Sequence, residues 1–401
     1  MAKTLSPNTI ALVKATVPAL QEHGLDIVRT MYSRMFQNPA IRDLFNQSHH
    51  NGEAPQHRAL AMAILAYGSN IDNLGALTGA VERIAQKHVG LQILPEHYPY
   101  VAEALLGAIK EVLGDAATEE ILAAWGEAYW FLADILINRE AQLYQETADA
   151  KGGWTGWRDF RVEEVRPESS VITSFVLRPV DGKPVVRHKP GQYLTFWLTV
   201  PGQPPVKRNY SISSAPNGET YRISVKREPH GLASGWMHGE VTPGTILKVG
   251  APAGDFYLEN KPQQPLVLLS GGVGLTPMVS ILETAAANGW DGEVHFVHGT
   301  QDGSTHALGD HVRSLASMCP KAKVSIFYET PHVEDTAGYD EAGLINEAWL
   351  AANTPVETAD YYVCGPKAFM RAMVAALGRL GVEQSRIHYE FFGPADELLA
   401  A

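Results

Sequence analysis

The spacing of apolar residues over the first 150 positions predicts a helical region. Ile10, Val13 and Val17 recur at intervals of three and four residues, which places them on one face of an α-helix. Ser6 is expected to cap the start of this helix, and Pro7 suits its first turn because a missing N–H costs nothing there. The first region is therefore predicted to be all-helical.

Breaks and further helices follow from the same pattern. Gly24 and the pair Asn38-Pro39 are expected to interrupt the helices. Further helical periodicity covers residues 55–73, 76–90, 96–113 and 118–146. The pattern then changes at Lys151-Gly152-Gly153-Trp154, which indicates a domain boundary near residue 150.

From residue 155 to about 258 the chain has the pattern of short strands separated by turns rich in proline and glycine. The β-rich or alternating stretches are Val171–Leu177, Tyr193–Val200, Arg208–Ser213 and Tyr221–Val225. Strands at this spacing indicate a small antiparallel β-barrel.

A third pattern begins near residue 262, where continuous apolar strands alternate with helical stretches. The strands are expected at Pro265–Ser270, Val294–His298, Val324–Tyr328 and Tyr361–Cys364. Uninterrupted apolar strands of this kind are typical of a parallel sheet covered by helices on both faces.

Composition narrows this picture. A chain of 401 residues has room for two or three domains, and the patterns favour three: residues 1–150 all-α, 151–260 an antiparallel β-barrel and 261–401 α/β. The net charge of −12 argues against nucleic acid as a partner. Cys319 and Cys364 are too few for a disulfide framework, and no apolar run is long enough for a transmembrane segment. A cytoplasmic protein is expected.

One histidine of the helical region is expected to face inward. Leu77, Val81 and Ile84 form a helical stripe that His88 continues. Taken alone, this pattern fits a core histidine that makes one hydrogen bond. Tyr98 and Glu140 also fall on predicted inward faces, and the residues expected around the same cavity are Tyr32, Phe45, Gln56 and Leu60. A carboxylate and a phenol near the ring could orient it as they do for a metal-bound imidazole, and a tyrosine and a glutamine could hydrogen-bond a small ligand.

Together these residues resemble the bacterial globins. The resemblance implies that His88 is the proximal iron ligand of one haem b, and that Tyr98 and Glu140 complete a charge-relay triad with it. It also implies that Tyr32 and Gln56 hydrogen-bond the oxygen ligand. Phe45 and Leu60 match residues that pack on the haem.

The predicted barrel carries two candidate flavin motifs. In Arg208-Asn209-Tyr210-Ser211 the period of a strand places Arg208 and Tyr210 on one face, where a guanidinium suits a pyrophosphate and a tyrosine ring suits a flavin. Gly231 to Ser234 opens a short helix whose free N–H groups suit a phosphate. An exposed strand with one charge and an ordinary helix cap are the alternatives. With Tyr193 in Pro-Gly-Gln-Tyr, the order of motifs resembles the FAD barrel of the ferredoxin-NADP reductase superfamily.

The third region carries a candidate nucleotide loop between a strand and a helix. Glycines at such a turn let the backbone approach a pyrophosphate at the helix N-terminus. The loop comprises Gly271, Gly272, Val273, Gly274, Leu275, Thr276 and Pro277. A second strand runs into Cys364-Gly365-Pro366, and in a parallel sheet both turns lie at the same edge. A tight turn, with Cys364 as a small buried residue, is the alternative to a nicotinamide contact.

The C-terminal segment adds further candidates. In the reductase superfamily a terminal aromatic residue covers the flavin, and the best match is Phe392, followed by Phe391. The whole candidate segment comprises Glu390, Phe391, Phe392, Gly393 and Pro394. The stretch after His298 lacks the arginine that would hold a 2′-phosphate, which favours NADH over NADPH.

The three regions in this order resemble the flavohaemoglobin family. The resemblance implies a monomeric oxygen-binding enzyme with one haem b, one FAD and NADH or NADPH as electron donor. It implies nitric oxide dioxygenation, in which nitric oxide and O2 become nitrate, and it assigns Lys87 and Glu390 to electron transfer between the cofactors. A reductase for alkyl hydroperoxides or ferric chelates, and an O2 carrier or sensor, remain alternatives.

Overall fold

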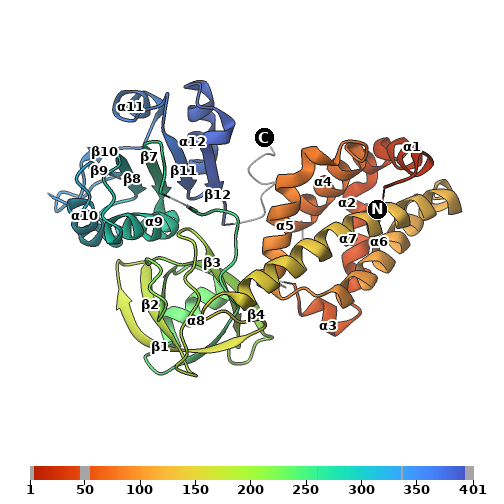
Figure 1. Ribbon diagram of the computed structural model, residues 1–401, viewed down its shortest axis with the longest axis horizontal. Coiled ribbons are helices and arrows are strands. Elements are labelled where there is room, and N and C mark those ends of the chain that lie inside the picture. The colour runs from red at the N-terminus through yellow and green to blue at the C-terminus, as the bar shows by residue number, and fades with distance from the viewer. Residues whose placement is uncertain (1–3, 46–54, 260, 336, 393–401) are drawn as a thin grey trace. The chain divides into compact units, whose positions relative to one another are not determined.

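The computed structural model describes residues 4–45, 55–259, 261–335 and 337–392 (Figure 1). These residues form two compact units. One holds the described residues up to Asp149 together with Pro205–Lys207, and the other holds Ala150–Pro204 and the described residues from Arg208 on. No helix in the described ranges is long and apolar enough to cross a bilayer.

The first unit is helical. Its helices are α1 (Pro7–Ala15), α2 (Val17–Met35), α3 (Pro39–Arg42), α4 (Pro55–Ser69), α5 (Thr78–Leu91), α6 (Tyr98–Leu113) and α7 (Glu119–Asp149). The predicted cap is confirmed, since the Ser6 hydroxyl accepts a hydrogen bond from the Thr9 N–H at 3.0 Å. Asn38 likewise caps α3 through the N–H of Ala40. The core lies where α2 packs on α4 and α6.

The prediction that Gly24 breaks a helix is wrong, because α2 runs through this position. Gly24 is buried, and a Cβ added there would lie 3.8 Å from Cβ of Ala61 on α4, so the glycine sits at a helix–helix contact. The break falls at Thr16 instead, between α1 and α2. The helix expected over residues 55–73 ends earlier, at Ser69, and a 3₁₀ turn (Leu74–Leu77) leads into α5.

The second unit contains an antiparallel sheet, as the sequence predicts. Its strands are β1 (Arg158–Pro167), β2 (Ile172–Pro179), β3 (Tyr193–Leu198), β4 (Val206–Ser211), β5 (Tyr221–Lys226) and β6 (Ile246–Val249). Their order across the sheet is β4-β3-β6-β1-β2-β5, and the first two residues of β4 are among those grouped with the first unit. Helix α8 (Leu232–Glu240) lies between β5 and β6 in the chain. Strand β1 pairs with β2 and β6, and both pairs are antiparallel.

The same unit contains a parallel sheet, also as predicted. Its strands are β7 (Leu266–Gly271), β8 (Val294–Thr300), β9 (Ala322–Tyr328), β10 (Glu341–Ala342), β11 (Asp360–Cys364) and β12 (Ile387–Glu390). The strand order β10-β9-β8-β7-β11-β12 reverses direction at β7. Helices α9 (Leu275–Ala287) and α10 (Gly309–Ser317) cover one face, and α11 (Glu347–Asn353) and α12 (Lys367–Arg379) cover the other (Figure 1). Right-handed crossovers on the two sides of a reversal produce this arrangement. The division into three domains at residues 150 and 260 stays a prediction.

The turns that follow β7 and β11 touch one another at the point where the strand order reverses. A Cβ added to Gly274 would lie 2.2 Å from the carbonyl oxygen of Cys364, and a Cβ added to Gly365 would lie 3.1 Å from the backbone nitrogen of Gly271. Only glycine fits such a close approach of two backbones. The expectation that the two turns lie at one edge of the sheet is therefore confirmed, and this is the edge at which open α/β sheets bind ligands.

Replacing Gly274 by alanine tests this close approach. Because the new Cβ would meet backbone rather than a movable side chain, we expect a loss of about 1–3 kcal/mol in the free energy of unfolding, measured by chemical denaturation. Gly378→Ala in α12 is the control, since nothing lies within 4 Å of its added Cβ, and it should keep or slightly raise stability. Equal effects of the two substitutions would contradict the predicted clash.

Candidate functional site

Three helices bring the predicted triad together. His88 lies on α5, Tyr98 is the first residue of α6 and Glu140 lies on α7. Nδ1 of His88 is 2.7 Å from Oε1 of Glu140, and the Tyr98 hydroxyl donates a hydrogen bond of 2.6 Å to the same oxygen. The tyrosine oxygen lies 3.2 Å from Nδ1 of His88. The structure thus places the three side chains in mutual contact, which sequence spacing alone could only suggest.

The burial of Glu140 determines how the protons are arranged. Glu140 is 2% exposed, and a carboxylate in such surroundings depends on hydrogen-bond donors. Burial, reinforced by the Glu140 hydrogen bond, raises the pKa of Tyr98 and keeps it a phenol that donates. Because the carboxylate accepts at Oε1, Nδ1 of His88 carries a proton, which leaves Nε2 as the ring nitrogen available to a metal.

This arrangement fits a metal-binding imidazole. In metal-bound histidines the ring nitrogen away from the metal usually donates to a carboxylate or a carbonyl, and here Nδ1 donates to Glu140. A neutral imidazole with a free lone pair is the ligand that globins offer to haem iron. The donor set of His88 therefore fits a haem group bound at Nε2.

A second contact holds α5 against α7 beside the triad. Arg139, the neighbour of Glu140, binds Glu82 with two parallel hydrogen bonds, Nε to Oε2 at 2.7 Å and Nη2 to Oε1 at 3.0 Å. Gln86 donates to the same Glu82 carboxylate at 2.9 Å. A bidentate pair fixes geometry as well as distance. It restrains the two helices that carry His88 and Glu140.

Tyr32 is the centre of the predicted ligand side. It is 5% exposed, and burial raises its pKa, so it remains a hydrogen-bond donor at neutral pH. Its ring lies 5.6 Å from Phe45 in an edge-to-face contact, and Leu60 belongs to the same apolar cluster. Gln56 is half-buried in the first turn of α4. Its contact with Tyr32 stays a prediction.

Sequence reasoning missed His57. Its ring lies 4.8 Å from that of Tyr32, it is 7% exposed, and burial lowers its pKa. A signal was present, because His57 precedes Leu60 by three residues and so shares its helix face. The cluster around Tyr32 and the cluster around Tyr98 both include Tyr129 of α7, which links the two sides of the candidate haem site.

Strand β4 presents the predicted flavin motif. Arg208 and Tyr210 are half-buried, Asn209 is exposed and Ser211 is buried. Burial lowers the pKa of Arg208 and raises that of Tyr210 to about 12. The Tyr210 ring packs 5.5 Å from Phe196 of β3. The motif therefore offers a shielded cation beside an aromatic ring, as a flavin nucleotide requires.

Tyr193, at the start of β3, carries an unsatisfied hydroxyl. Its Oη is buried and has no hydrogen-bond partner in the described chain. Buried polar atoms without a partner are rare in folded proteins. Its ring lies 3.0 Å from the position of a Cβ added to Gly254, whose φ of +114° also favours glycine. Burial, followed by the charges of Glu390 and Asp255, raises the pKa of Tyr193 and keeps this donor protonated.

The turn before α8 is closed by its own residues. The Ser234 hydroxyl accepts from the Glu228 N–H at 3.1 Å and lies 3.3 Å from the Gly231 carbonyl, and Gly231 itself is the N-cap. The alternative interpretation, in which Ser234 is an ordinary helix cap, is therefore not the one found. Its role toward a phosphate stays a prediction.

The nucleotide loop has the predicted backbone form. Gly272–Gly274 is a 3₁₀ turn at the end of β7, and α9 begins at Leu275. The Thr276 hydroxyl donates to the Val273 carbonyl at 3.1 Å and so closes the loop. Pro277 is buried. The loop presents a helix N-terminus at the edge where β7 and β11 end.

Cys364 lies at the same edge. It is fully buried, and burial, followed by the charge of Glu390, raises the pKa of its thiol well above the ordinary value. In the sheet it stands opposite Ser270 of β7 and Glu390 of β12. Pro366 is the N-cap of α12.

The remaining candidates differ in exposure. Lys87 is half-buried beside His88, Phe391 is half-buried and Phe392 is 47% exposed. Gly393 and Pro394 lie outside the described residues. The assignment of Lys87 and Phe392 to cofactor contacts stays a prediction.

Comparison with known proteins decides the family. The globin family matches residues 29–136, and the oxidoreductase NAD-binding domain family matches residues 268–375. A flavohemoprotein of Xylella fastidiosa (strain 9a5c) is 53% identical over 401 residues, with 100% of both chains covered. The chain belongs to the flavohemoprotein family. The family and fold class predicted from sequence are confirmed, and this flavohemoprotein is an oxidoreductase in which a globin is joined to an NAD-binding module.

Solved structures agree with this family. Flavohemoglobin from Malassezia yamatoensis, with bound FAD and haem, superposes with a TM-score of 0.88 at 28% identity, covering 98% of this chain and 100% of that chain. The FAD/NAD binding domain of nitric oxide dioxygenase from Vibrio cholerae O1 biovar El Tor has a TM-score of 0.55 at 39% identity, covering 59% of this chain and 99% of that domain.

Buried histidines predict how the stability of this flavohemoprotein changes with pH. Burial lowers the pKa of His188 to about 4, of His298 to about 3 and of His306 to about 4. Below pH 6.5 these histidines bind protons in the unfolded chain but not in the folded chain. Their contribution to the free energy of unfolding is therefore fully present above pH 6.5 and decreases as the pH falls toward 4. Each group contributes about 1.4 kcal/mol per pH unit across its window.

Urea denaturation between pH 7.5 and 5 measures this dependence. His188→Gln should lessen the pH dependence of the free energy of unfolding, because one of the three groups that change protonation is removed. His230→Gln is the matched control, since His230 is exposed in both states. An unchanged slope for His188→Gln would contradict the prediction.

Proposed function

We propose that this chain is an NAD(P)H-dependent nitric oxide dioxygenase that holds haem b, FAD and a nicotinamide dinucleotide. The observation that carries the proposal is the 2.7 Å contact between Nδ1 of His88 and the buried Glu140, in a chain that also contains an oxidoreductase NAD-binding domain. An imidazole that donates to an anion is a stronger electron donor, which favours oxygen activation over storage.

The helical unit supplies the haem site in this proposal. Haem iron, when bound, supplies the position at which O2 binds and a centre that changes charge by one electron. His88 would hold it through Nε2. Tyr32 stays protonated and can hydrogen-bond a polar diatomic ligand, while Phe45 and Leu60 keep water away from it.

The antiparallel sheet supplies the flavin site. FAD, when bound, links a donor of two electrons to an acceptor of one. Arg208 would pair with its pyrophosphate, and Tyr210 would lie against its ring system. The unsatisfied hydroxyl of Tyr193 would find its partner on the same group.

The parallel sheet supplies the site for NADH or NADPH. Glycines 271, 272 and 274 bring the backbone close to a pyrophosphate, and the N-terminus of α9 favours its negative charge. Cys364 would line the nicotinamide side as a neutral thiol. A cytoplasmic, monomeric enzyme fits this proposal, with O2 and nitric oxide as its substrates.

Turnover of nitric oxide tests the proposed activity. The purified holoprotein is mixed with NADH and nitric oxide in air, and NADH oxidation and nitrate are followed together. We expect nitric oxide to accelerate NADH oxidation and nitrate to appear. Acceleration by an alkyl hydroperoxide or a ferric chelate, with no nitrate from nitric oxide, would assign a different reductase.

Glu140→Gln tests the triad by spectroscopy. Because an amide is neutral, the hydrogen bond to Nδ1 of His88 weakens, and the bond between His88 and ferrous iron should weaken with it. Resonance Raman of the ferrous protein should show the iron–histidine stretching band at lower frequency. Glu127→Gln, an exposed residue on the same helix, is the control and should leave the band in place. An unshifted band in Glu140→Gln would contradict the assigned role.

A further inference from the structure

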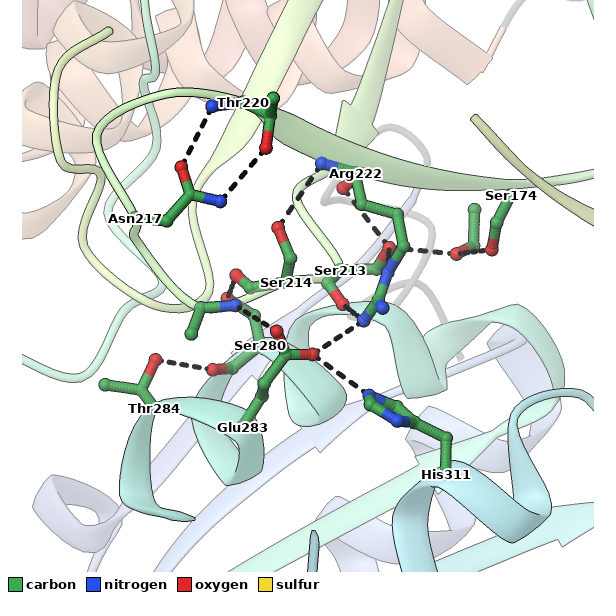
Figure 2. Close-up of polar contacts among 12 residues, drawn as sticks. Ser174, Ser213, Ser214, Asn217, Thr220, Arg222, Ser280, Glu283, Thr284 and His311 are labelled. Carbon is green, nitrogen blue, oxygen red and sulfur yellow. Dashed lines mark hydrogen bonds and ion pairs between the residues drawn. The ribbon is translucent and has the colours of Figure 1, made fainter. Parts of the chain in front are cut away.

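A partly buried polar cluster joins the two sheets of the second unit, and its centre is Glu283 of α9 (Figure 2). Oε2 of Glu283 accepts from Nη2 of Arg222 at 2.8 Å and from Nε2 of His311 at 3.0 Å. Oε1 accepts the backbone N–H of Ala215 at 3.1 Å. Arg222 belongs to β5 and Ala215 to the loop before it, while His311 belongs to α10. One carboxylate therefore connects both sheets of the unit.

The loop on the barrel side is held at several backbone atoms. The Ser214 carbonyl accepts from the Ser280 hydroxyl at 2.8 Å and from Nε2 of His188 at 3.0 Å. The Ser213 carbonyl accepts from Nη2 of Arg222. Ser213–Ala215 begins two residues after β4 ends, so the segment that α9 grips continues the proposed flavin strand.

The cluster is shielded and charged. Ser280 is fully buried, and the side chains of Arg222 and Glu283 are 15% and 23% exposed. Burial tends to raise the pKa of Glu283, but the hydrogen bond from His311 and the charge of Arg222 bring it below its ordinary value. Glu283 is thus an anion at neutral pH. Removing one partner of such a shielded pair strongly destabilises the fold, because the other charge is left unpaired.

Glu283 lies on the same helix, α9, that begins in the nucleotide loop. Helix α9 begins at Leu275, within the nucleotide loop and eight residues before Glu283, which is about two helical turns. On the other side of the cluster, the contacted loop segment Ser213–Ala215 begins two residues after the proposed flavin strand β4 ends. Both proposed cofactor sites are therefore connected to this carboxylate through short segments of chain, one a helix and the other a loop held by hydrogen bonds.

We infer that Glu283 is a positioning residue that holds the flavin strand and the nucleotide helix at the separation needed for hydride transfer, without touching either cofactor. The inference rests on the proposed function. In the step concerned NAD(P)H loses a hydride and becomes NAD(P)⁺, and the flavin gains that hydride together with a proton. A shift of about 1 Å in such an arrangement can slow transfer on the order of a hundredfold.

The test compares Glu283→Gln and Glu283→Ala with the unaltered holoprotein. Flavin reduction by excess NADH is followed anaerobically in a stopped-flow spectrophotometer, with NADH and with NADH deuterated at the transferred position. We expect at least tenfold slower reduction in Glu283→Ala, a smaller loss in Glu283→Gln, and a larger deuterium isotope effect in both. The affinity for FAD should change by less than about twofold, since Glu283 does not contact the flavin.

Asp340→Asn is the matched control. Asp340 also accepts from an arginine, Arg313, and from a backbone N–H, that of Ile326, but all three lie in the elements around the parallel sheet. We expect its flavin reduction to match the unaltered protein. Equal slowing in Asp340→Asn, or reduction within twofold of normal in both Glu283 variants, would overturn the inference.

Hydrogen exchange supplies a readout that needs no turnover. The Ala215 amide should exchange faster in Glu283→Ala, because its acceptor is gone, and unchanged exchange would overturn the proposed grip on the loop. If Glu283→Ala does not fold, Glu283→Gln and Arg222→Met carry the same comparison. Failure of NADH to reduce the flavin of the unaltered protein would instead reject the proposed function, so the two failures are distinguishable.

Discussion

A carboxylate buried in a protein must be met by hydrogen-bond donors, and the helical unit is organised around that requirement. Glu140 lies near the middle of α7, among apolar residues of three helices. There α5 and α6 bring His88 and Tyr98 to its Oε1, whose burial without donors would be costly. The same requirement selects the histidine tautomer. Packing, proton placement and ligand chemistry in this unit therefore follow from one anion and its two donors.

A second anion has a comparable place in the other unit, although its surroundings differ. Glu140 gathers a histidine and a tyrosine around one oxygen, whereas Glu283 gathers an arginine, a histidine and a backbone N–H over both oxygens. The first arrangement tunes the chemistry of a side chain. The second fixes the relation between two layers of the fold. In both, hydrogen bonds between polar side chains fix the relative positions of the elements that carry them. Apolar contacts, which are not directional, fix these positions less tightly.

Much of the fold could be predicted from periodicity, because each element buries a face that repeats at its own period. The apolar run around Leu266–Leu269 and the stripe that ends at His88 are clear examples. Gly24 misled the prediction, since a glycine that admits a neighbouring helix looks in sequence like one that ends a helix. The candidate site was partly predictable through the family resemblance. Glu283 could not be predicted, because its partners come from residues 215, 222 and 311, and a glutamate in a helix ordinarily indicates a solvated face.

The burial of both cysteines has a consequence for the chemical reactivity of the chain. The thiolate is the form of cysteine that oxidants and nitrosating agents attack. Burial raises the pKa of Cys319 and of Cys364, so each sulfur is both shielded and protonated at neutral pH. Both thiols therefore lack the exposed thiolate character that makes a cysteine a ready target for S-nitrosation or sulfenic acid formation.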